Sequence, residues 1–180
     1  MIEPVAKPIP TVGHSAGSHR VGAVHSGAPT IFVFEDVLGR MLRYAETNLN
    51  RELAGFLVGG LHEDHGIYVE VRGFVPATET RSGAISVTFT HETWAAMTRR
   101  VEEEFPGEVI LGWMHTHPGL GVFLSSHDLF IHRHFFAQPW QIAAVIDPQK
   151  HQLGFFQWHQ DQIVNCGFVC LRRAVRQEAG

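Results

Sequence analysis

The chain has 180 residues, enough for one domain with a full hydrophobic core. Its hydrophobic content of 44% suits a soluble globular protein, and its formal net charge of −4 argues against nucleic acid as the main partner. No apolar run approaches the roughly 18 residues that a membrane span needs, and the N-terminus lacks the apolar core of a secretory signal. We therefore expect a soluble, single-domain protein.

The two cysteines, Cys166 and Cys170, lie four positions apart rather than in a Cys-x-x-Cys motif. On one strand they would share a face, too far apart along the chain for an easy disulfide. We expect buried free thiols and a reducing, cytoplasmic compartment. The thirteen histidines exceed the needs of one site, so we expect several of them to be solvated.

The first half of the chain predicts an arm, a helix and a hairpin. Residues 1–29 are rich in Gly, Pro, Ser, Ala and His without periodicity, which indicates a flexible arm. A strand over residues 31–34 precedes a helix that starts at Glu35 or Asp36. Its apolar face is predicted to contain Val37, Leu38, Met41, Leu42, Ala45 and Leu49. The hairpin consists of an apolar strand over 53–61, a charged turn over 62–66 and a returning strand over 67–76.

The second half alternates helices and strands. The polar segment 77–88 predicts a mobile loop, and a helix from about residue 90 ends before Pro106-Gly107. Its core-facing residues are predicted to be Trp94, Met97, Val101 and Phe105. The further elements are strands over 108–114, 141–146, 153–158 and 164–171, and a helix that Ser125 starts and that runs to Phe136. This order predicts an α/β sandwich with a mixed sheet, with one domain over residues 30–176.

The residues with the clearest chemistry lie between 112 and 128. His115 and His117 are two apart at the end of an apolar strand, so both imidazoles lie on one face. Pro118 then ends the strand. Ser125 and Asp128 have the spacing of a helix capping box, which by itself is the simpler interpretation. Two imidazoles and one carboxylate are also the ligand set of a catalytic zinc site, where the fourth position stays open for water.

Glu52 is a carboxylate directly before an apolar strand. Taken alone, it is best interpreted as an exposed acid at the junction of a helix and a strand. His127, His132 and His134 follow the motif closely; we expect them not to be ligands, because the set of three is complete without them.

Taken together, these residues resemble the JAMM (MPN+) metalloprotease family. The family pattern is Glu, a variable gap, His-x-His-Pro, six residues, Ser, two residues and Asp. It is matched here by Glu52, His115, His117, Pro118, Ser125 and Asp128, with Gly55 completing Glu-x-x-Gly. The flanks Gly112-Trp113 and Phe123-Leu124-Ser125-Ser126 are similar to AMSH-type and proteasome-lid deubiquitinating members. The resemblance covers residues 31 to about 170.

The resemblance implies a cytidine-deaminase-like α/β/α sandwich, the JAB1/MPN fold. It implies a Zn²⁺ ion held by His115, His117 and Asp128, with Glu52 as the general base. It also implies that Ser125 donates a hydrogen bond to the developing oxyanion.

The resemblance further implies ubiquitin or a ubiquitin-like protein, and its conjugates, as the partner. In the resembling enzymes, segment 77–88 corresponds to an insertion that contacts ubiquitin, and we predict that Ile85, Val87 and Thr88 add a strand to the substrate tail. A second insertion common in chain-cleaving relatives is absent or minimal between 146 and 153, so a linkage preference is not implied. The alternatives are a peptidase that processes the C-terminus of a ubiquitin-like or sulfur-carrier precursor, and a non-catalytic MPN scaffold.

Overall fold

The computed structural model describes residues 2–10, 15–77 and 91–173. One mixed sheet contains every strand found there, in the order β2-β10-β3-β5-β4-β6-β7-β8-β9, with β1 paired to β4. The elements are β1 (Val5–Ala6), β2 (Ser15–Val21), β3 (Thr30–Phe34), α1 (Glu35–Ala45), β4 (Ala54–Glu63), β5 (Ile67–Pro76), α2 (His91–Glu104), β6 (Val109–Thr116), α3 (Ser126–Phe135), β7 (Ile142–Asp147), β8 (Gln152–His159), β9 (Gln162–Cys166) and β10 (Phe168–Arg173).

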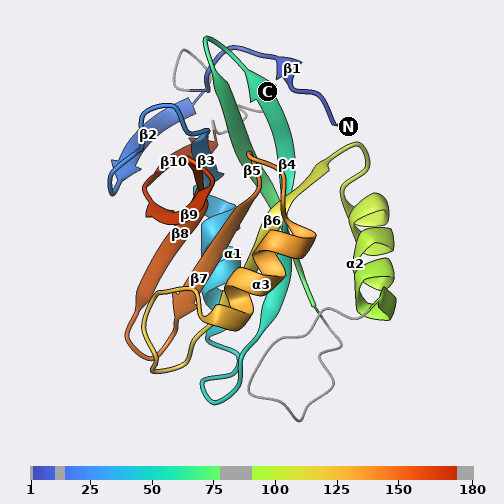
Figure 1. Ribbon diagram of the computed structural model, residues 1–180, viewed down its shortest axis with the longest axis vertical. Helices are drawn as coiled ribbons and strands as arrows, with labels where there is room; N and C mark the ends of the chain where they lie inside the picture. Colours follow the sequence, from blue (N-terminus) through green and yellow to red (C-terminus); the bar gives the residue numbers. More distant parts are fainter. Residues whose placement is uncertain (1, 11–14, 78–90, 174–180) are drawn as a thin grey trace, which may run out of the picture.

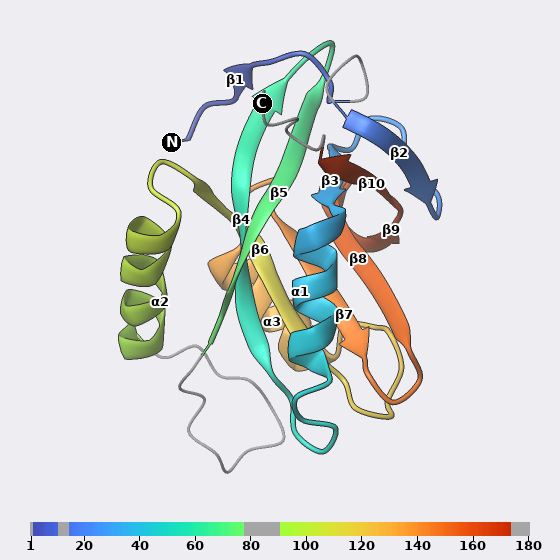
Figure 2. The same ribbon diagram turned by 180° about the vertical axis from the view of Figure 1, so that it is seen from behind.

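Helices cover both faces of the sheet. Figure 1 shows α3 in front of the central strands with α2 beside them, and Figure 2 shows α1 on the opposite face. Strand β4 alternates between the two layers, because Leu57 packs in the core with α1 whereas Phe56 and Val58 pack in the core with α2 and α3. The predicted α/β/α sandwich with a mixed sheet is therefore confirmed.

Helix α1 is shorter than its apolar pattern predicts. Val37, Met41 and Ala45 recur at the four-residue spacing of one helical face, and all three are fully buried. Leu42 and Leu49 were also predicted to face the core, but their exposed fractions are 38% and 44%. The helix ends at Ala45, so Leu49 falls beyond it, and Leu42 lies on the flank of the buried stripe.

The segment before residue 30 differs from the expected flexible arm. Strand β2 pairs antiparallel with β10, and β1 pairs parallel with the end of β4. Lys7 forms an ion pair with the buried Glu70, and the Tyr68 hydroxyl donates to the backbone carbonyls of Lys7 and Pro8. These partners lie at least 57 positions away along the chain, so the local composition did not reveal them.

The sheet curls because its last two strands lie near opposite ends of the strand order. Only Gly167 separates β9, at one edge, from β10, which lies next to the strand at the other edge. A Cβ on Gly167 would lie 2.5 Å from the carbonyl oxygen of Val21, so the crossing requires glycine. The single strand predicted over 164–171 is therefore two strands. Cys166 and Cys170 lie on different strands, and both are buried free thiols, as predicted.

Candidate metal centre

The centre of the site is the end of β6, a strand enclosed between β4 and β7. His115 is in register with Ala54 of β4 and Val145 of β7, and it is fully buried. His117 follows directly after the strand, where its backbone N–H donates to the Ile146 carbonyl at 2.8 Å. Backbone bonding on both sides thus fixes the two histidines before any side chain contributes.

Three side chains converge as metal ligands would. The Nε2 atoms of His115 and His117 are 3.0 Å apart, and each lies 3.4 Å from one carboxylate oxygen of Asp128. One ligand atom from each residue falls within 4.8 Å of the others, and all three residues are buried. Among the described residues this is the one such cluster of His, Cys, Asp and Glu, so His127, His132 and His134 do not join it.

The charges of this cluster suit a divalent cation. Burial lowers the pKa of His115, which keeps its ring neutral, the form that binds a metal. Burial also opposes protonation of His117, but the carboxylates of Asp128 and Glu52 outweigh it and raise the pKa of that ring, so a metal ion competes with a proton there. Burial raises the pKa of Asp128, but hydrogen bonds from both rings outweigh it and hold that pKa far below its ordinary value. An ionised carboxylate beside two ring nitrogens therefore fits Zn²⁺.

Asp128 serves as helix cap and as candidate ligand at once. Ser125 is the N-cap of α3, and its hydroxyl accepts from the Asp128 backbone N–H at 3.2 Å. In return, Asp128 Oδ2 accepts from the Ser125 backbone N–H at 2.7 Å. The capping box is therefore present, and it is compatible with the ligand interpretation because the same carboxylate also faces the two histidines.

Glu52 lies at the edge of the same cluster. Its Oε1 is 3.8 Å from His117 Nε2, and the side chain is largely buried rather than an exposed junction acid. Thr116 holds this part of the chain in place: the Leu53 N–H donates to Thr116 Oγ1 at 2.8 Å, and the Thr116 N–H donates to the Leu53 carbonyl at 2.9 Å. No motif in the sequence indicates this role of Thr116, although its place between the two histidines is the available signal.

Asp147 fixes the loop that follows His117. Its buried carboxylate accepts from the backbone N–H groups of Gly119 at 2.9 Å and Gly121 at 2.7 Å, and also from those of Gln149 and Lys150. Gly119 and Gly121 have positive φ values of 75° and 90°, which favour glycine. The sequence predicts only a turn at Asp147, because nothing local indicates which backbone N–H groups its carboxylate binds.

Ile85, Val87 and Thr88, the predicted substrate contacts, lie outside the described residues. The described end of the preceding strand lies close to the site: the Ala77 N–H donates to the Ala54 carbonyl at 2.8 Å, two residues after Glu52. The Tyr44 hydroxyl connects the same two residues, because it donates to the carbonyls of both Ala54 and Ala77. The last described residue before segment 78–90, Ala77, therefore lies beside the candidate metal centre.

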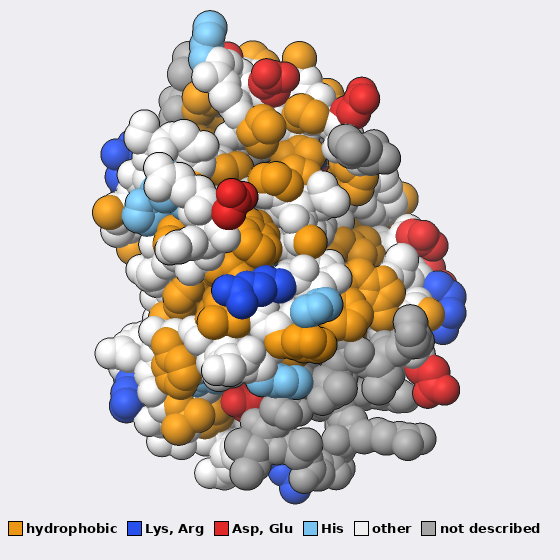
Figure 3. Space-filling view, viewed as in Figure 1, with side chains coloured by type: hydrophobic (Ala, Val, Ile, Leu, Met, Phe, Trp, Pro, Cys, Tyr) orange, Lys and Arg blue, Asp and Glu red, His pale blue; other side chains and the backbone are white. Residues whose placement is uncertain are grey.

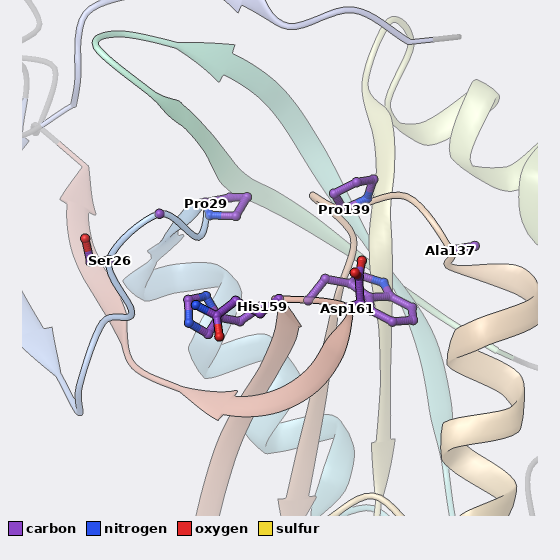
Figure 4. Close-up of a pocket in the computed structure, with 9 residues that line it drawn as sticks. Ser26, Pro29, Ala137, Pro139, His159 and Asp161 are labelled. Atoms are coloured by element: carbon purple, nitrogen blue, oxygen red, sulfur yellow. The ribbon is translucent and has the colours of Figure 1, made fainter.

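A separate cavity of about 540 Å³ lies beside the C-terminal end of α3 (Figure 4). Its wall comes from the chain before β3, the segment after α3 and the β8–β9 turn. The lining residues are Ser26, Gly27, Pro29, Ala137, Pro139, Trp158, His159, Gln160 and Asp161. None of the candidate site residues lines it.

One family profile matches more than half of the chain. Residues 26–138 match the sequence profile described as "JAB1/Mov34/MPN/PAD-1 ubiquitin protease". The chain is 29% identical over 128 residues to 26S proteasome non-ATPase regulatory subunit 14 of Dictyostelium discoideum, covering 71% of this chain and 41% of that protein. It is 30% identical over 146 residues to a STAM-binding protein-like protein of Xenopus laevis, covering 79% of this chain and 33% of that protein.

A third relative has a different name. The NAD(+) hydrolase TcpA of Theionarchaea archaeon (strain DG-70-1) is 36% identical over 104 residues, covering 57% of this chain and 29% of that protein. The chain thus spans less than half the length of each of these relatives.

The fold itself has a solved counterpart. The solution structure of protein DSY2949 from Desulfitobacterium hafniense has a TM-score of 0.63 and 19% sequence identity, covering 84% of this chain and 99% of that one. No helix in the described part of this chain is long and apolar enough to cross a membrane.

Proposed function

Because the chain belongs to the JAB1/Mov34/MPN/PAD-1 ubiquitin protease family, we propose that it is a zinc-dependent isopeptidase that removes ubiquitin or a ubiquitin-like protein from lysine side chains. The observation that carries the proposal is the convergence of His115 Nε2, His117 Nε2 and the Asp128 carboxylate, with Glu52 Oε1 3.8 Å from His117 Nε2. A binding scaffold needs neither this ligand set nor a carboxylate beside it.

His115, His117 and Asp128 hold the ion in this proposal. A bound Zn²⁺ supplies Lewis acidity, which lowers the pKa of a water to about 7 and polarises the scissile carbonyl. Glu52 accepts a proton from the attacking water at a carboxylate oxygen and delivers it to the departing lysine amine. The Ser125 hydroxyl donates to the oxygen on which negative charge develops.

The surface around the site supports a protein substrate. Large exposed apolar side chains lie on the loop after His117 and on α3, namely Leu120, Phe123, Phe130 and Phe135. Figure 3 shows hydrophobic side chains gathered on this face of the molecule. Exposed apolar groups of this kind commonly mark sites of protein contact. For the substrate tail, we keep the proposal that Ile85, Val87 and Thr88 pair with it as an added strand.

The first experiment compares two substrates: a ubiquitin-like protein linked to lysine, and a precursor of that protein with a C-terminal extension. Wild-type protein loaded with zinc is expected to cleave the lysine conjugate. Glu52→Gln keeps the side-chain shape but cannot accept the proton, so it is expected to retain zinc and lose most turnover. Glu46→Gln is the matched control, since Glu46 is exposed and lies just beyond α1.

The outcomes separate the candidate functions. Cleavage of the precursor alone would reassign the protein to C-terminal processing. Zinc binding without cleavage of either substrate would support the scaffold, which the presence of all six motif residues argues against. Chelation is expected to abolish turnover and added zinc to restore it, so carefully purified active protein without zinc would rule out the proposed chemistry.

A further inference from the structure

Within the described part of the chain, His115 lacks the hydrogen bond that usually orients a metal-binding histidine. Such a ring normally donates its second N–H to a carboxylate or a carbonyl, which fixes the ring plane. Here the Nδ1 atom of His115 is buried, and it has no hydrogen-bond partner among the described residues. Another contact must therefore fix the direction in which His115 Nε2 points.

Ring stacking supplies that contact. Trp113 lies two residues before His115 on the same face of β6, and its ring is stacked on the imidazole with centroids 4.4 Å apart and planes 12° apart. Both side chains are fully buried, so neither has room to turn independently of the other. The plane of the indole thus determines the plane of the imidazole.

His132 in turn fixes the indole. The Trp113 Nε1–H donates to His132 Nδ1 at 3.1 Å across the interface between β6 and α3. An indole nitrogen can only donate, so His132 Nδ1 is the acceptor and a neutral His132 ring carries its proton on Nε2. Phe136, one helical turn further, lies parallel to Trp113 with planes 9° apart. Trp158 packs on His132 with centroids 5.6 Å apart.

From this geometry we infer that His132 is a positioning residue for the metal centre. Its Nδ1 holds the Trp113 indole by one hydrogen bond, and the indole holds the His115 ring so that Nε2 points at the ligand cluster. His132 contacts neither substrate nor ion in this arrangement. The inference rests on the proposed function only in requiring that the cluster binds zinc.

The acceptor atom is the property of His132 that matters. A leucine at this position would fill the space, but it would remove the His132 acceptor from the buried indole N–H and with it the bond that holds the ring. A glutamine offers a side-chain oxygen at similar reach and would keep the hydrogen bond. Loss of a partner that orients a ligand typically lowers metal affinity or activity by roughly 10- to 100-fold.

The test compares His132→Leu and His132→Gln in the full chain, with His134→Leu as the matched control. His134 is an exposed histidine on the same helix. Three quantities are measured: zinc affinity by competition with a chromophoric chelator, the visible absorption spectrum of the Co²⁺-loaded protein, and the melting temperature of the metal-free protein. The Co²⁺ spectrum reports ligand geometry, which a role confined to stability would not change.

His132→Leu is expected to weaken zinc binding roughly 10- to 100-fold and to shift the Co²⁺ bands, and His132→Gln is expected to restore both. If His132→Leu does not fold, Trp113→Phe removes the same N–H, keeps a stacked ring and should show the same losses. A folded His132→Leu or Trp113→Phe protein with wild-type affinity and spectrum overturns the positioning role. Wild-type protein that binds neither ion would instead overturn the proposed metal centre.

Discussion

Asp147 offers a quantitative test of how the site is held. It is the last residue of β7, and its four backbone hydrogen bonds connect the loop after His117 to the β7–β8 turn. Oδ1 accepts from Gly119 and from the two residues of the turn, whereas Oδ2 accepts from Gly121 alone. Asp147→Asn keeps one oxygen but places an NH₂ group, itself a donor, at the other position.

The size of the effect follows from that substitution. If the asparagine oxygen occupies the Oδ1 position, the Gly121 N–H loses its acceptor and faces another donor. A hydrogen bond to a charged group contributes about 1.5–3 kcal/mol. Because Gly121 is only half-buried and its N–H can bond to water instead, we expect the lower part of this range. Asp147→Ala removes all four acceptors and should cost more.

Chemical unfolding of metal-free protein at pH 7 measures the free energy of unfolding. Asp161→Asn is the matched control, because Asp161 is an exposed acid in the β8–β9 turn, and asparagine tolerates its positive φ of 60°. Burial raises the pKa of Asp147, but the N–H groups of Gly119, Lys150, Gly121 and Gln149 outweigh it and lower that pKa below its ordinary value of 3.8.

The lowered pKa fixes the pH dependence. The stability that the Asp147 carboxylate contributes is present above its ordinary value of 3.8 and is lost as pH falls through the folded-state pKa. The difference between wild type and Asp147→Asn should therefore shrink in acid. A loss for Asp147→Asn no larger than that of the control, or one independent of pH, would refute the anchoring role.

Three further predictions concern Ser125, segment 77–88 and His132. Ser125→Gly should lower the free energy of unfolding by only a few tenths of a kcal/mol, because glycine is tolerated as a helix cap. It should lower turnover by roughly 100- to 1,000-fold, because the oxyanion loses a donor, and an unchanged turnover would mean that Ser125 acts only as a helix cap. Val87→Pro removes a backbone donor, so it should raise KM or lower kcat for protein conjugates while zinc stays bound. An unchanged kcat/KM would mean that the substrate tail pairs with another part of the chain. Burial lowers the pKa of His132 from 6.5 to about 4. As pH falls, this histidine is therefore protonated in the unfolded chain before it is protonated in the folded protein. Metal-free wild type should therefore lose stability relative to His132→Gln as pH falls from 6.5 towards 4. If the free energies of unfolding of the two proteins change equally over this pH range, the prediction is wrong.

The sequence determined the local parts of the site. The spacing of His115 and His117 placed both rings on one face of a strand, because side chains alternate along any β-strand. Ser125 and Asp128 specified a helix start by their separation alone, and α3 begins there. The helices and most core strands followed in the same way, since hydrophobic periodicity shows which face of an element is buried.

Only the tertiary structure decided which of these faces meet. Strand β2 pairs with β10, which lies far away in the sequence, through backbone hydrogen bonds. The side chains of the two strands do not indicate that these segments are partners. Trp113 and His132 are 19 positions apart, and each looks like an ordinary core residue until α3 packs on β6. Asp147 likewise gains its role from glycine N–H groups 26 and 28 positions away. Periodicity is a property of the local backbone repeat, whereas the partner of a buried polar group depends on the path of the whole chain.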